Sequence, residues 1–203
     1  MTGSGDAGWG VPWLDRSGSY QVTARWSRAL GLPRPLPDGL GLAVRVEGAD
    51  GPGTTLDLLF TSSRPGRFGR HLPLLRPDAL AGPYSTLLSY RVGDHDRVLA
   101  AFPVPDPGRT LPTLWQELDR RPVRFDLRAA APTEPWRTFA SLSLEYAHTA
   151  PPTHTVSYDP YAHALPRLHP TGRLRRLRDA AYAGSRHGRT NGRYDSTEGD
   201  ARQ

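Results

Sequence analysis

Short stretches in which apolar and polar residues alternate recur along this chain, and glycine and proline separate them. In the first stretch, Val22, Ala24 and Trp26 are interleaved with polar residues. A period of two places the apolar side chains on one face of a β-strand, so each stretch is typical of a half-buried strand. Similar stretches occur at 42–46, 56–60, 123–128 and 137–145, and weaker ones at 84–92 and 97–102.

The spacing of the turns decides the fold class. The 21 glycines and 21 prolines interrupt the strands at short intervals, which is typical of antiparallel sheets and not of strand–helix–strand units. The remaining patterns predict a short helix at 111–120 and a longer one from about 171 to 187. We therefore predict a mainly β (α+β) single domain, formed by a curved antiparallel sheet or small β-barrel with a C-terminal helix packed on it.

Length bounds the domain organisation. A chain of 203 residues is long enough for one domain with a substantial core and short for two. The last residues are polar and contain glycine, and the first ones show no strand or helix pattern. We expect a flexible N-terminus at 1–15, the folded domain at 16–189 and a disordered tail at 190–203.

Composition disfavours several classes of function. The chain has no cysteine, which excludes disulfides, thiolate metal sites and cysteine nucleophiles. The formal net charge is +6, but the arginines are scattered among acidic residues up to about residue 167, so we expect no nucleic-acid partner. We also expect a soluble cytoplasmic protein without a membrane partner, because no segment has the pattern of a signal peptide or a membrane span.

A tyrosine among arginines stands out in the predicted C-terminal helix. Arg178, Tyr182 and Arg189 are at positions i−4, i and i+7, so they share one helical face. A neighbouring guanidinium lowers the pKa of a phenol from about 10, and a phenolate is able to bind ferric haem as an axial ligand. The same residues also fit the solvated face of an amphipathic helix, and the spacing leaves both interpretations open.

Several segments resemble the haem catalases, in the same order along the chain. Residues 23–31 and 37–46 resemble the catalase pattern V-R-F-S followed by D-P-R-G-F-A-V-K-F, and residues 136–144 resemble the catalase strand that ends in G-K-L-V-L. Ser157-Tyr158-Asp159-Pro160 resembles the motif A-F-D-P. Residues 172–189 resemble the motif G-R-L-F-S-Y-P-D-T-H-R-H-R. The similarity covers about half of the chain. The pattern of Arg-Leu-Arg before Ala-Tyr and a following Ser-Arg is similar to small actinobacterial catalase-like proteins without an assigned role.

The resemblance implies a haem site. In the catalase helix the tyrosine is the proximal iron ligand, with one arginine four residues before it and another seven after it, and Tyr182, Arg178 and Arg189 match both offsets. Arg25 occupies the arginine position of V-R-F-S, which implies that it pairs with a haem propionate. On this resemblance we expect a haem-binding protein with Tyr182 on the iron and Arg178, Arg189 and Arg25 around the cofactor.

The chain departs from the catalases on the distal side of the haem. Catalases use a distal His upstream of V-R-F-S and a distal Asn shortly after A-V-K-F, but here no His precedes His71 and no Asn precedes Asn191. General base chemistry on hydrogen peroxide needs a proton acceptor above the iron. We therefore expect a weak peroxidase that acts on organic peroxides, or a haem carrier or sensor, and not an efficient catalase.

Two other classes of function remain open. A barrel that kept the fold and lost the cofactor would act as a binding module. A phosphodiester hydrolase would depend on one of two groups of polar residues. These groups are His95 with Asp96 in a predicted hairpin turn, and His154, His163 and His169 with Asp159 in a proline-rich loop. The histidine spacings fit no compact metal-ligand set, so the hydrolase is the third choice.

Overall fold

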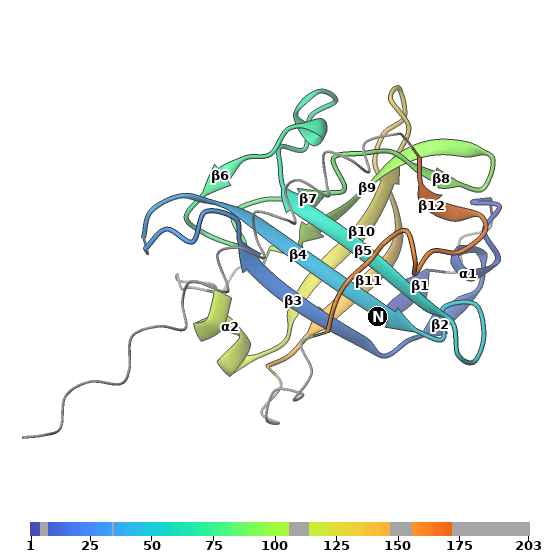
Figure 1. Ribbon diagram of the computed structural model, residues 1–203, viewed down its shortest axis with the longest axis horizontal. Coiled ribbons are helices and arrows are strands. Elements are labelled where there is room, and N and C mark those ends of the chain that lie inside the picture. Colours follow the sequence, from blue (N-terminus) through green and yellow to red (C-terminus); the bar gives the residue numbers. More distant parts are fainter. Residues whose placement is uncertain (5–7, 34, 106–113, 147–155, 172–203) are drawn as a thin grey trace, which may run out of the picture. The chain divides into compact units, whose positions relative to one another are not determined.

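Antiparallel β-strands dominate the computed structural model, which describes residues 1–4, 8–33, 35–105, 114–146 and 156–171 (Figure 1). The elements are β1 (Thr2–Ser4), α1 (Pro12–Asp15), β2 (Ser17–Ser19), β3 (Val22–Arg28), β4 (Asp38–Glu47), β5 (Thr55–Ser62), the 3-10 helix η1 (Gly69–His71), β6 (Leu75–Arg76), β7 (Tyr84–Ser85), β8 (Tyr90–Val92), β9 (His95–Pro103), α2 (Leu114–Arg120), β10 (Val123–Ala130), β11 (Arg137–Leu144) and β12 (Leu168–Pro170). The predicted helix at 171–187 lies almost entirely outside the described residues.

One curled sheet contains the strands. Nine of them follow each other in the order β2-β1-β11-β10-β9-β7-β5-β4-β3, while β6, β8 and β12 pair beside this path. The curvature brings distant strands together: the rings of Trp26 in β3 and Phe125 in β10 are 5.9 Å apart between centroids, although four strands separate β3 from β10 along the path. The sheet is thus a half-barrel (Figure 1), and the prediction of a mainly β fold with a curved antiparallel sheet is confirmed.

The apolar residues at every second position of the predicted strands point into the core. Trp26, Leu42 and Phe60 are paired across β3, β4 and β5, and directly paired residues point to the same face of a sheet. Leu42 and Phe60 are buried, and Trp26 packs against the same cluster. Burial of one such large apolar side chain contributes roughly 1.5–3 kcal/mol, so the inner faces of these strands supply much of the stability.

The N-terminus differs from the expectation of a flexible segment. The structure places β1 and α1 there, and β1 pairs with both β2 and β11. Trp9 and Trp13 are each 2% exposed, and Trp9 packs edge-on against Phe139, with 6.1 Å between ring centroids. A strand of three residues and a helix of four are too short to show a period in the sequence.

Two weaker predictions hold in part. The stretch 84–92 forms two strands, β7 and β8, because Leu87 has a φ of 57° and such a backbone conformation interrupts an extended chain. Helix α2 occupies the described part of the predicted helix at 111–120. Among the described helices, none combines the length and the apolar character needed to cross a membrane.

Candidate functional site

The faces of β3, β4 and β5 that point away from the core carry an unusual set of side chains. Strand pairing arranges these side chains in rows, because residues paired across neighbouring strands share a face. The rows are Thr23–Arg45–Asp57, Arg25–Ala43–Leu59 and Ser27–Gly41–Thr61. The first row contains the charged side chains of Arg45 and Asp57, and the central residues of the next two rows are small, Ala43 and Gly41. We call this surface the outer face.

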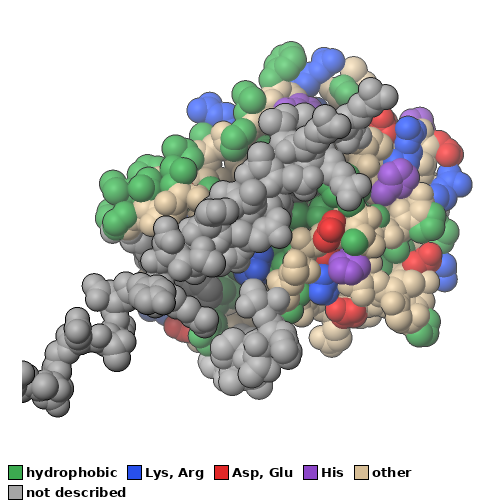
Figure 2. Space-filling model, viewed as in Figure 1, with side chains coloured by type: hydrophobic (Ala, Val, Ile, Leu, Met, Phe, Trp, Pro, Cys, Tyr) green, Lys and Arg blue, Asp and Glu red, His purple; other side chains and the backbone are tan. Residues whose placement is uncertain are grey.

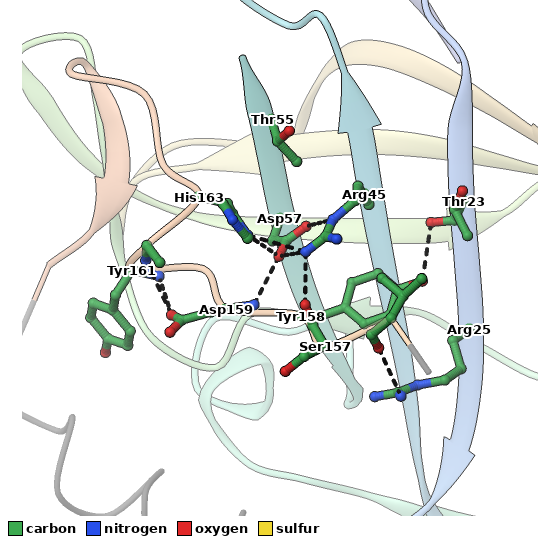
Figure 3. A network of polar contacts seen from close by, with 12 residues as sticks. Thr23, Arg25, Arg45, Thr55, Asp57, Ser157, Tyr158, Asp159, Tyr161 and His163 are labelled. Carbon is green, nitrogen blue, oxygen red and sulfur yellow. Dashed lines mark hydrogen bonds and ion pairs between the residues drawn. The ribbon is translucent and has the colours of Figure 1, made fainter. Parts of the chain in front are cut away.

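Residues 156–163 fold back over the outer face (Figure 3). Val156 and Tyr158 pack against Ala43 and Leu59 in a small apolar cluster that is separate from the main core. The Tyr158 ring lies 5.0 Å from the guanidinium carbon of Arg25 and 5.3 Å from that of Arg45. Stacking between a guanidinium and an aromatic ring is favourable, so Tyr158 holds this segment between two cations of the sheet.

Asp57 is the centre of the polar contacts, and its side chain is fully buried. Arg45 donates two hydrogen bonds to it, from Nε to Oδ1 and from Nη2 to Oδ2, both at 2.7 Å. His163 Nδ1 and the backbone N–H of Asp159 each lie 2.8 Å from Oδ2. A guanidinium, an imidazole and a backbone N–H from distant parts of the chain therefore converge on one carboxylate (Figure 3).

These contacts set the ionisation of the pair. Burial alone would raise the pKa of Asp57, but the hydrogen bonds from Arg45, His163 and the Asp159 N–H outweigh it and hold the pKa below its usual range. The hydrogen bond to Asp57 is the main reason why the pKa of Arg45 is raised. The ion pair between Arg45 and Asp57 is therefore fully charged at neutral pH.

His163 is oriented by this carboxylate. A carboxylate only accepts hydrogen bonds, so Nδ1 carries the proton that points to Asp57. An Asp–His pair of this kind is able to serve as a general base. No described hydroxyl or thiol hydrogen-bonds to Nε2, however, and Arg45 occupies the other side of Nδ1 at 3.1 Å. The arrangement therefore acts as a clamp that fixes residues 156–163 to the sheet, and it lacks the nucleophile of a catalytic triad.

Arg25 is the cation of the outer face that has the fewest partners. Its Nη1 donates a long hydrogen bond of 3.4 Å to the carbonyl of Val156, and its guanidinium stacks on Tyr158. Within the described part of the chain it forms no ion pair with a carboxylate. The structure therefore leaves the charge of Arg25 without a carboxylate partner among the described residues, and its pairing with a haem propionate stays a prediction.

Tyr158 stays a neutral phenol. Burial raises its pKa, although Arg25 and Arg45 work in the opposite direction. A phenol with a raised pKa is a poor iron ligand at neutral pH, because binding requires the phenolate. The haem proposal therefore still depends on Tyr182, which lies with Arg178 and Arg189 outside the described residues.

The residues proposed for a hydrolase are not gathered into one site. His95 and Asp96 begin strand β9 after a turn at residues 93–94, both are exposed, and Asp96 pairs with Arg91 at 3.2 Å. His163 is bound to Asp57, whereas His169 lies in strand β12. His154 falls outside the described residues. In the part of the chain that the structure describes, no group of three or more His, Asp or Glu residues is arranged to hold a metal ion.

Asp159 of the same loop has a local role. Its Oδ1 accepts hydrogen bonds from the backbone N–H groups of Tyr161 and Ala162, at 2.9 and 3.1 Å. Such a turn is a common use of aspartate in loops. Its own N–H donates to Asp57, so Asp159 shapes the segment that carries Tyr158 and His163.

Sequence patterns did not single out Asp57 and Arg45. In an alternating strand both occupy the polar positions, where solvent-exposed charges are ordinary, and residues 156–163 come about a hundred residues later. One signal was present: Asp57 is surrounded by Leu56, Leu58 and Leu59, and a carboxylate in so apolar a stretch needs a partner.

Comparisons with protein families, curated proteins and solved structures found no match to this chain. The link to the haem catalases therefore depends on the sequence motifs and on what the structure brings together around Arg25.

Proposed function

We propose that this chain is a degenerate catalase-like protein that binds haem and acts as a weak peroxidase on organic peroxides, or as a haem carrier or sensor, without efficient catalase activity. The observation that supports the proposal most is the position of Arg25. Two segments chosen only for their resemblance to catalase motifs, 23–31 and 157–160, are in contact there through Arg25 and Tyr158.

Arg25 is the group of the outer face that would hold an acidic group of the ligand. Its guanidinium stacks on Tyr158 and pairs with no carboxylate among the described residues, so it would pair with a haem propionate. Bound haem would supply a ferric centre with Lewis acid and redox chemistry.

Replacing Arg25 tests this assignment. Arg25→Gln should weaken ferric haem binding on the order of tenfold, because a charge-assisted hydrogen bond is worth about 1.5–3 kcal/mol. Arg124→Gln is the matched control, since Arg124 is an exposed arginine on β10. The affinities are measured by absorption titration with haem. Equal affinities of the two variants would remove Arg25 from the haem site.

Peroxide chemistry provides a second prediction. Because no His precedes His71 and no Asn precedes Asn191, the haem-loaded chain should disproportionate hydrogen peroxide negligibly compared with a true catalase. Oxygen evolution measured with an electrode checks this expectation. Vigorous oxygen release that depends on bound haem would show that another group replaces the distal His.

A cofactor-free binding module is the alternative. The observation in its favour is the closed polar network of Asp57, Arg45 and His163, which is able to stabilise the outer face without any ligand. A chain that folds to the same stability with and without haem, and shows no saturable haem spectrum, would favour this alternative.

A further inference from the structure

Large apolar side chains are exposed in two segments of the sheet rim. Of the eight large hydrophobic residues that are most exposed among the described residues, five lie in the β3–β4 connection or between β5 and β6, and a sixth, Leu75, begins β6. These six, which we call the apolar rim, are Leu30, Leu32, Leu36, Phe68, Leu72 and Leu75. Phe68 is 81% exposed. Hydrophobic side chains gather along this edge, over β6 and the β3–β4 connection (Figure 2).

The two segments are neighbours. Strand β6 pairs with the start of β4, with Gly39 opposite Leu75. A Cβ on Gly39 would lie 3.3 Å from the Ala29 side chain and 3.6 Å from Leu75 Cδ2, so Leu75 lies beside the residue that precedes Leu30. Ser62 joins the segments as well, because it accepts a hydrogen bond from Leu40 N and donates one to Leu74 O.

The leucines of the β3–β4 connection are held in place by a buried carboxylate. Asp38 is fully buried, accepts hydrogen bonds from the N–H groups of Leu30 and Leu32 at 2.9 and 3.1 Å, and pairs with Arg28 at 3.3 Å. Arg28 also donates to the carbonyl of Leu36. The loop therefore presents Leu30, Leu32 and Leu36 outward in a defined shape.

Side-chain hydrogen bonds to the backbone also hold the loop that carries Phe68. The buried Arg70 donates from Nε to the carbonyl of Arg67 at 3.1 Å, and Trp136 donates from Nε1 to the carbonyl of Pro65 at 2.9 Å. Both segments therefore hold their exposed apolar side chains on an anchored backbone, and a group of exposed apolar side chains marks an interaction site.

The charges beside the apolar rim have one sign. Residues 29–37 and 63–77 contain no acidic residue, and they include Arg64 and Arg67, both exposed. The guanidinium of Arg67 is 6.0 Å from the Phe68 ring, and a Cβ on Gly69 would meet Arg64 Cβ at 2.6 Å. The most exposed aromatic residue is thus accompanied by two cations.

We propose that the apolar rim binds the surface of an anionic lipid bilayer, with Phe68 and the leucines at the boundary between headgroups and acyl chains and Arg64 and Arg67 on the lipid phosphates. Apolar side chains that enter this boundary, flanked by cations, are the recognised chemistry of surface association. A second copy of the chain fits less well, because two such surfaces would bring like charges together. The inference does not depend on haem, and surface association needs no spanning helix.

Vesicle sedimentation tests the proposal with the full chain. The chain should sediment with vesicles of phosphatidylglycerol and phosphatidylcholine, and much less with phosphatidylcholine alone. Phe68→Ser with Leu72→Ser should reduce the partition coefficient at least roughly tenfold, because two large apolar side chains no longer leave water. Arg64→Gln and Arg67→Gln should each reduce binding to the anionic vesicles about fivefold.

Matched controls separate a specific surface from general attraction by a basic protein. Val104→Ser changes an exposed apolar residue outside the rim, and Arg124→Gln changes an exposed arginine elsewhere; both should bind vesicles like the unaltered chain. Equal losses in the controls, or no sedimentation at all, would overturn the proposal. So would a dimer in sedimentation velocity that Phe68→Ser dissociates while vesicle binding is absent, because a second copy would then be the occupant.

Discussion

Asp57→Asn is expected to lower the free energy of unfolding by about 3 kcal/mol at neutral pH, because it breaks a buried ion pair and leaves Arg45 without its counter-charge. Asp57 is fully buried, and Arg45 is only 16% exposed in its side chain. The amide has nearly the volume of the carboxylate, so the loss reports the charge and hydrogen bonds more than the packing. Urea unfolding followed by circular dichroism measures this change.

The effect should depend on pH in a defined direction. The pKa of Asp57 is lowered in the folded chain, so its ionisation stabilises the fold fully above the pKa of the unfolded state, about 3.9. This contribution is lost as the pH falls through the lower, folded pKa. The stability difference between the unaltered chain and Asp57→Asn should therefore be constant above about pH 5 and shrink in more acidic buffers.

Asp96→Asn is the matched control, because Asp96 pairs with Arg91 on the surface, where both side chains are more than two-fifths exposed. An exposed pair contributes about 0–1 kcal/mol, so this variant should unfold almost like the unaltered chain. If Asp57→Asn cost no more than Asp96→Asn, the network on the outer face would not be what fastens residues 156–163.

Tyr182→Phe should abolish the high-spin ferric haem spectrum while the chain stays folded, because it removes only the oxygen that would bind the iron. Tyr146→Phe, at an exposed tyrosine, is the control and should keep the spectrum. If Tyr182 is only a helix residue, its change to Phe costs a hydrogen bond of about 1 kcal/mol and leaves the spectrum unaltered. An unchanged spectrum would therefore eliminate Tyr182 as the iron ligand.

The two arginines proposed beside Tyr182 should have graded effects. Arg178→Ala should weaken haem binding less than Tyr182→Phe, since a raised phenol pKa adds a deprotonation cost of about 1.4 kcal/mol per unit. Arg189→Ala should weaken haem binding because Arg189 would pair with a propionate or with the phenolate of Tyr182. This loss of affinity should become smaller at high salt if that ion pair is exposed to solvent. Titrations of both variants with haem at two salt concentrations distinguish these roles. Equal losses of haem affinity in Arg178→Ala and Arg189→Ala at both salt concentrations would argue against the two roles.

Strand alternation was enough to predict the central part of the fold. Trp26, Leu42 and Phe60 face the core as their period of two requires, and this pattern is local, so it is visible without a structure. The N-terminal elements were not predictable in this way, because β1 is held by pairing with β2 and β11, and Trp9 and Trp13 by packing on Phe139 and Tyr20.

The candidate site was predictable only in part. Arg25 was identified through a motif, and the structure brings it together with Tyr158 of a second motif. The clamp of Asp57, Arg45 and His163 was not foreseen, because it joins residues separated by 106 positions. An alternating pattern places Arg45 and Asp57 on the outward face of their strands, but it does not indicate which later segment covers them.

The most direct test of the proposed function is absorption titration of the full, unaltered chain with ferric haem. The proposal predicts a saturable high-spin ferric spectrum with one haem per chain, typical of a tyrosinate ligand. Titration without saturation, or a spectrum no different from that of haem in buffer, would contradict haem binding and leave the cofactor-free binding module as the better account of this half-barrel.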